Sequence, residues 1–199
     1  LFLIVFLLVH LTANLFVFGG AEAYNAACHF MDTNPIIKIM VPFLAVGFAI
    51  HIIYAVILTM HNNKARPVKY AAKDLKGTSE WASRNMFVLG VIVLGVLCIH
   101  LTDFWANMQL QTLFLGKEME VLPFDLIINK FTNPLFVVIY IVWVIALWFH
   151  LTHGFWSAFQ SIGLCNQIWI KRWKCVARLY AIVIALGFIS IPLYVFFCL

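Results

Sequence analysis

Four apolar stretches of this sequence each carry histidine. The residues are His10, His51, His100 and the closely spaced His150 and His153. Ligating side chains inside a membrane span are costly to bury and by default mark a functional site. A lone buried histidine is more often a hydrogen-bonded core residue than a ligand, but histidine on each of four stretches predicts a shared chemical role. Because neutral imidazole is a good axial ligand for iron, that role is haem binding.

The stretches that must position these histidines are long enough to cross a bilayer. Of 199 residues, 64% are hydrophobic and 11% are charged, whereas soluble domains average about 45–50% apolar and about 25% charged residues. This composition excludes a soluble domain. A crossing takes about 20 apolar residues, and the apolar stretches fall at about 1–18, 36–60, 86–115, 135–159 and 176–199. We predict an all-α polytopic membrane protein with five transmembrane helices in a single domain, 1–199.

Caps and breakers mark the ends of these helices. Asn34 with Pro35, and Asn133 with Pro134, precede the second and fourth stretches. An Asn can cap a helix there, and the N–H that Pro lacks would have no partner at the first helical position. The first stretch has no charged n-region and no Ala-x-Ala cleavage site. We therefore expect a shortened first membrane helix and not a signal peptide.

Basic residues gather in the connectors after the second and fourth stretches, which contain ten of the 13 Lys and Arg. The first and third connectors are acidic or balanced. By the positive-inside rule the basic connectors are cytoplasmic, so the first helix runs outward and the directions then alternate. The basic residues are Lys64, Arg66, Lys69, Lys73, Lys76 and Arg84, followed by Lys171, Arg172, Lys174 and Arg178.

This orientation places the histidines at two levels, because a helix rises about 1.5 Å per residue. His10 lies roughly 12 Å below the outer boundary, and His100 lies about 22 Å from the cytoplasmic end. His51 and His153 lie about 15 Å and about 12 Å from that end. We predict two bis-histidine b haems inside the first four helices, His10 with His100 and His51 with His153. Residues three apart share a helix face, so geometry leaves His150 open as the inner ligand.

This arrangement resembles a known family, the di-haem cytochrome b membrane anchors of succinate:quinone oxidoreductases that have five helices in one chain. The resemblance covers essentially the whole chain. In that family a Gly follows the helix-four ligand, which favours His153. The residues that carry the resemblance are Leu1-Phe2-Leu3 leading to His10, then His51, Trp81 through Arg84, His100-Leu101-Thr102-Asp103-Phe104-Trp105 and His150-Leu151-Thr152-His153-Gly154.

The resemblance implies electron transfer between quinone and a flavoprotein plus iron–sulfur module that interconverts succinate and fumarate. Members of the family use menaquinone, which is the quinone that we expect here. The resemblance also implies an acidic residue near the start of helix two at the quinone site, and Asp32 is the nearest match. A solvated loop carboxylate is the alternative for Asp32. Arg84 could pair with a haem propionate, or act as an ordinary interfacial anchor.

The implied location is the bacterial cytoplasmic membrane. Lipid is then a further partner and nucleic acid is not, while a dimer of complexes stays open. Two other functions also stay open: a cytochrome b subunit of another quinone-linked dehydrogenase or hydrogenase, and a haem-free proton-coupled transporter that uses the histidines as a relay. The five cysteines form no C-x-x-C-H motif, so the sequence argues against covalently attached c-type haem.

Overall fold

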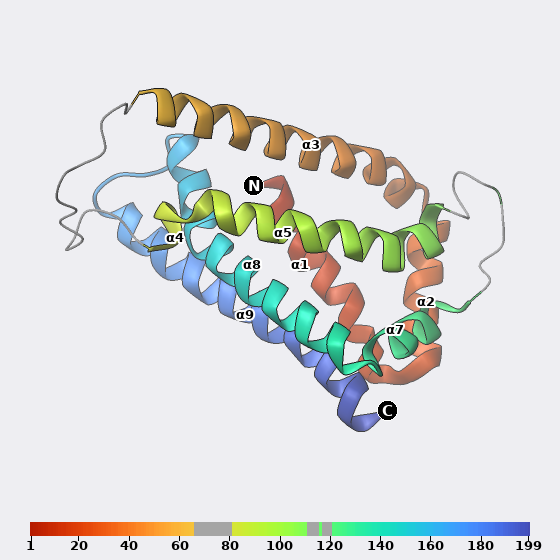
Figure 1. Ribbon diagram of the computed structural model, residues 1–199. Coiled ribbons are helices and arrows are strands. Elements are labelled where there is room, and N and C mark those ends of the chain that lie inside the picture. Colours follow the sequence, from red (N-terminus) through yellow and green to blue (C-terminus); the bar gives the residue numbers. More distant parts are fainter. Residues whose placement is uncertain (66–80, 111–115, 117–120) are drawn as a thin grey trace.

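The structure, a computed structural model, describes residues 1–65, 81–110, 116 and 121–199 (Figure 1). The elements in these ranges are helical and include no strand, which confirms the all-α class. The predictions that concern Arg66, Lys69, Lys73 and Lys76, and the stretch 111–115, fall outside the described residues. Five helical spans are long and apolar enough to cross a membrane, as predicted: Phe2–Thr33, Pro35–Lys64, Met86–Leu110, Pro134–Ser161 and Trp169–Cys198.

The first span bends at Gly20. Helix α1 (Phe2–Leu15) passes through a 3-10 turn, η1 (Phe16–Gly19), into α2 (Gly20–Thr33). Gly20 has φ +82°, a conformation that residues with a Cβ rarely adopt. The chain changes direction there, and α2 runs along one end of the bundle (Figure 1). The predicted first helix, about 1–18, corresponds to α1 and η1, and the amphipathic α2 that follows them was not predicted from the sequence.

Helices α3 (Pro35–Lys64) and α8 (Pro134–Ser161) begin where the Asn-Pro pairs predict. The Asn34 side chain accepts a hydrogen bond from the backbone N–H of Ile36 at 2.9 Å. Asn133 accepts one from the backbone N–H of Leu135 at 3.0 Å. Each Asn satisfies a backbone donor that has no partner within the helix, so the predicted caps are confirmed.

The third span changes helix type after His100. A single turn, α4 (Trp81–Arg84), precedes α5 (Met86–His100), and the span continues as η2 (Leu101–Leu110), a stretch of π-helix. Such stretches are rare and often occur at functional sites. The connector that follows contains α7 (Pro123–Phe131), which the sequence analysis did not predict. The backbone N–H of Phe124 donates to Asn25 Oδ1 at 3.0 Å and joins α7 to α2.

The tightest packing lies between α8 and α9 (Trp169–Cys198), which run side by side (Figure 1). Ala177, Ala181 and Ile184 of α9 are completely buried. This helix begins seven residues before the predicted 176, because long basic side chains in its first turns can reach water while their stems cover apolar surface. Helix α3 differs, since it runs along the edge of the bundle away from α9 and contains no buried residue (Figure 1).

Candidate functional site

The histidines meet in two pairs, and each pair joins two helices. His10 of α1 faces His100 at the end of α5, with ring centroids 5.8 Å apart and planes at 85°. His51 of α3 faces His150 of α8, with centroids 6.1 Å apart and planes at 76°. We call His10 and His100 the first pair, and His51 and His150 the second pair. The partnership predicted between α1 and α5, and that between α3 and α8, both appear in the structure as ring contacts.

His153 lies one turn beyond His150 on α8. Its ring contacts Trp156, with centroids 4.9 Å apart and planes at 83°. The sequence analysis left the choice between the two histidines open on geometry and favoured His153 on resemblance. The ring contact with His51 favours His150, and the assignment of His153 stays a prediction.

Both pairs fit a metal held between two imidazoles. An imidazole nitrogen binds a metal ion at about 2.0–2.1 Å, so two rings on opposite sides of one ion have centroids roughly 6 Å apart. The observed separations are 5.8 and 6.1 Å. Nδ1 of His100 and Nδ1 of His150 are buried and have no hydrogen-bond partner in the described part of the chain. No group of three or more His, Cys, Asp or Glu side chains is arranged to hold a metal ion there, and each pair brings together two imidazoles.

Aromatic side chains surround the first pair. Phe6 and Phe188 contact the imidazole that α1 contributes, with centroid distances of 5.3 and 5.7 Å. Phe104 and Trp143 contact the imidazole from α5, at 5.4 and 5.5 Å. The four rings come from α1, α9, η2 and α8. They place the two imidazoles among aromatic rings, and the Asn14 Nδ2 lies 3.5 Å from both ring nitrogens of His10.

A polar cluster lies beside the first pair and consists of Asp103, Lys130 and Tyr140. The Lys130 Nζ lies 2.8 Å from Asp103 Oδ1 in an ion pair. The Tyr140 hydroxyl donates to Asp103 Oδ2 at 3.2 Å, and its ring centroid is 6.3 Å from that of His100. Sequence reasoning missed Lys130 and Tyr140 because they are 27 and 37 residues from Asp103. A carboxylate one turn after a candidate ligand was the signal that could have prompted a search for them.

Asp32 lies in the last turn of α2, at the same end of the bundle as the first pair. The Gln109 side chain donates a hydrogen bond from Nε2 to Asp32 Oδ1. Gln109 belongs to η2, the segment that starts directly after His100. The π-helical segment therefore links the carboxylate of Asp32 to the first pair.

Arg84 and Trp81 occupy α4, near the second pair. The Trp81 ring lies 5.1 Å from the ring of Phe149, the neighbour of His150. Arg84 is exposed and ends this short turn. Its role toward a haem propionate stays a prediction. Trp81 thus marks the end of the bundle opposite to Asp32.

Comparison with known proteins provides one clear relative. The chain is 31% identical over 167 residues to the succinate dehydrogenase cytochrome b558 subunit of Bacillus subtilis. The aligned region covers 80% of this chain and 73% of that protein. No protein-family model matches the chain, and no solved structure does.

Proposed function

Because this chain belongs to the family of succinate dehydrogenase cytochrome b subunits, we propose that it passes electrons between the iron–sulfur subunit of its complex and quinone, through two b haems. The chain is then a multi-pass membrane anchor whose partners are a flavoprotein and an iron–sulfur protein. Menaquinone is the proposed quinone. The relative favours this complex over another dehydrogenase or hydrogenase and over a haem-free transporter.

The observation that carries the proposal is the arrangement of two imidazole pairs on four spans. The two imidazoles of each pair would hold one haem through their ring nitrogens, and a bound haem supplies a one-electron carrier. The chain contributes two rings from different helices to each site, so helix packing sets their separation. Aromatic side chains pack around the first pair.

We assign His150, and not His153, as the partner of His51. Support comes from the ring contact across α3 and α8, with centroids 6.1 Å apart. His153 contacts Trp156 on its own helix. The two histidines share a face of α8, so a direct exchange of roles is the alternative.

Quinone chemistry couples electrons to protons, and Asp32 is the group that we assign to the proton step. Its carboxylate is half-buried, lies at the end of the bundle that holds the first pair, and accepts a hydrogen bond from Gln109. A carboxylate within hydrogen-bond reach of a quinone oxygen can deliver or accept a proton there. Arg84, at the other end, is the candidate for a haem propionate of the second pair.

The basic end of the bundle is the proposed docking face for the iron–sulfur subunit. Lys64 and Arg84 lie at the end where α3 and α8 finish and where α5 begins. By the positive-inside rule this end is cytoplasmic, in a bacterial inner membrane. Electrons would then pass between the second pair, nearer that face, and the first pair beside Asp32.

A haem assay on single variants of the purified complex tests this proposal. We expect two b haems per chain, and the loss of one of them in His10→Ala, His100→Ala, His51→Ala and His150→Ala, because each iron loses an axial ligand. His153→Ala is the matched control and should keep both. Haem loss in His153→Ala with two haems retained in His150→Ala would reverse the helix-four assignment. A complex without b-type absorbance would refute the function.

A further inference from the structure

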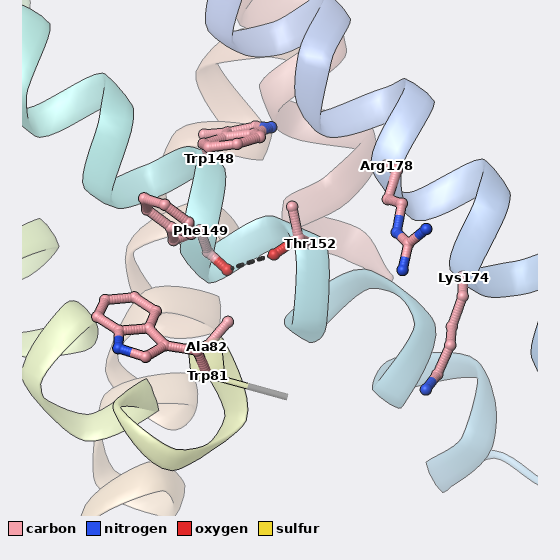
Figure 2. A pocket seen from close by; sticks show the side chains of 7 residues that line it. All are labelled: Trp81, Ala82, Trp148, Phe149, Thr152, Lys174 and Arg178. Atoms are coloured by element: carbon pink, nitrogen blue, oxygen red, sulfur yellow. Dashed lines mark hydrogen bonds between the residues drawn. The ribbon is translucent and has the colours of Figure 1, made fainter. Parts of the chain in front are cut away.

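A cavity outside both histidine pairs lies between α4, α8 and α9 (Figure 2). Its volume is about 230 Å³. On α8, Trp148 and Thr152 each lie two residues from His150, which turns them about 200° away from that imidazole. The cavity therefore opens mainly on a face of α8 that is turned away from the His150 imidazole. The lining consists of Trp81, Ala82, Trp148, Phe149, Thr152, Lys174 and Arg178.

The lining combines two cationic side chains with aromatic rings. Lys174 and Arg178 are four residues apart on α9 and share one face of that helix. Figure 2 shows both side chains along the α9 side of the cavity, with the rings of Trp148 and Phe149 across from them. The Lys174 ammonium also lies 4.7 Å from the Trp156 ring centroid. An occupant needs a negative group for the cations and an apolar part for the rings.

The cations continue into a second hollow along α9. This hollow has a volume of about 450 Å³ and shares Lys174 and Arg178 with the first, while Lys171 adds a third cation. Beyond Arg178 the exposed face of α9 becomes wholly apolar. Its side chains there are Leu179, Ile182, Val183 and Leu186, which are between 42% and 65% exposed.

This order of groups matches a phospholipid. Basic pockets between membrane helices bind anionic headgroups, because a phosphate gains both charge and hydrogen bonds there. Acyl chains need an apolar track that leads from the headgroup toward the centre of the bilayer. The cations lie near the start of α9, and Leu179, which lines the second hollow with them, leads to the exposed apolar side chains further along the helix.

We propose that this groove holds an anionic phospholipid, with its phosphate at Lys174 and Arg178 and its acyl chains along Leu179 and Leu186 of α9. The site is independent of the haems and of the proposed electron transfer. The lipid would fill the space between α4, α8 and α9 and join the short α4 turn to the tight α8–α9 pair.

The test measures lipid retention by the complete complex. The complex is purified in mild detergent, and its bound lipid is removed. It is then incubated with phosphatidylglycerol or phosphatidylcholine, and the lipid that it retains is measured by native mass spectrometry. We expect the wild type to retain phosphatidylglycerol in preference to phosphatidylcholine. Retention should fall about fivefold in Arg178→Gln and about 25-fold when Lys174→Gln is added, since each cation near an anionic surface contributes about a factor of five.

Arg172→Gln is the matched control, because Arg172 carries the same charge on the same helix but stacks on Trp169 and lines neither hollow. Its retention should equal that of the wild type. The double variant Lys174→Arg with Arg178→Lys should keep the lipid, which separates lost charge from lost folding. Equal retention of the two lipids, equal loss in the Arg172 control, or displacement of the lipid by inorganic phosphate at millimolar concentration would overturn the proposal.

Discussion

The two histidine pairs share a donor set but differ in how the protein surrounds them. The first pair lies among rings from four different elements, with the polar cluster of Asp103, Lys130 and Tyr140 beside it. The second pair takes one of its imidazoles from α3, a helix without a buried residue. Packing therefore holds one pair from all sides and the other mainly from the α8 side.

With one haem in each pair, as proposed, this difference predicts different roles for the two haems. Around the first pair, contacts within the protein already fix the imidazoles, so bound haem adds a redox group to a formed site. Around the second pair, a haem between α3 and α8 would add contacts that α3 lacks in the protein alone. Since cofactor binding free energy can stabilise the fold that provides the ligands, α3 should depend on the second haem.

The largest effect is expected when each pair is broken in turn. His150→Ala should raise amide hydrogen exchange along α3 by at least about tenfold, because the loss of the second haem removes contacts that hold α3. His100→Ala should leave exchange in α3 within about twofold of the wild type and affect α1 instead. Exchange followed by mass spectrometry on the purified complex measures both. Equal protection of α3 in the two variants would show that the pairs do not differ in this way.

Much of this comparison was accessible from the sequence. Apolar length defined the five spans, and Asn34 and Asn133 marked two helix starts that the structure confirms. Helices α2 and α7 were missed, because short amphipathic segments rich in polar residues look like connectors until they pack together. The choice between His150 and His153 depends on the rotation of α8 relative to α3, which spacing along one chain does not contain.

The next largest effect is expected at Asp32, at the proposed quinone site beside the first pair. Asp32→Asn should lower quinone-linked turnover by roughly 100-fold, since a positioned proton-transfer group contributes about 10²–10⁴ in rate. Both haem spectra should be unchanged. Glu22→Gln removes an exposed carboxylate from the same helix and should retain full turnover. Steady-state assays with succinate and a soluble quinone measure this, and full turnover in Asp32→Asn would move the site away from the first pair.

A smaller effect tests the polar cluster. Asp103→Asn removes a negative charge and leaves Lys130 without its carboxylate partner. The added positive potential favours the reduced iron, so the midpoint potential of the first haem should rise by roughly 40 mV, or about 1 kcal/mol for one electron. The second haem should not shift. Asp125→Asn, at an exposed position on α7, is the control in a potentiometric titration. Equal shifts of both haems would show that the cluster does not act locally.

The smallest effect is expected from two glycine substitutions, which compare how tightly α9 and α3 are packed. A Cβ added at Gly187 of α9 would lie 2.7 Å from two methyl carbons of Leu11, next to His10, whereas one at Gly47 of α3 would lie 3.1 Å from Phe2. Overpacking a tight site typically lowers the free energy of unfolding by about 1–3 kcal/mol. Because the methyl groups of Leu11 can move aside, the loss in Gly187→Ala should lie near the lower limit. Gly47→Ala should change the free energy of unfolding by less than about 0.5 kcal/mol, because an exposed α3 can shift. Denaturant unfolding in detergent measures both, and a larger cost at Gly47 would mean that α3 is held as firmly as α9.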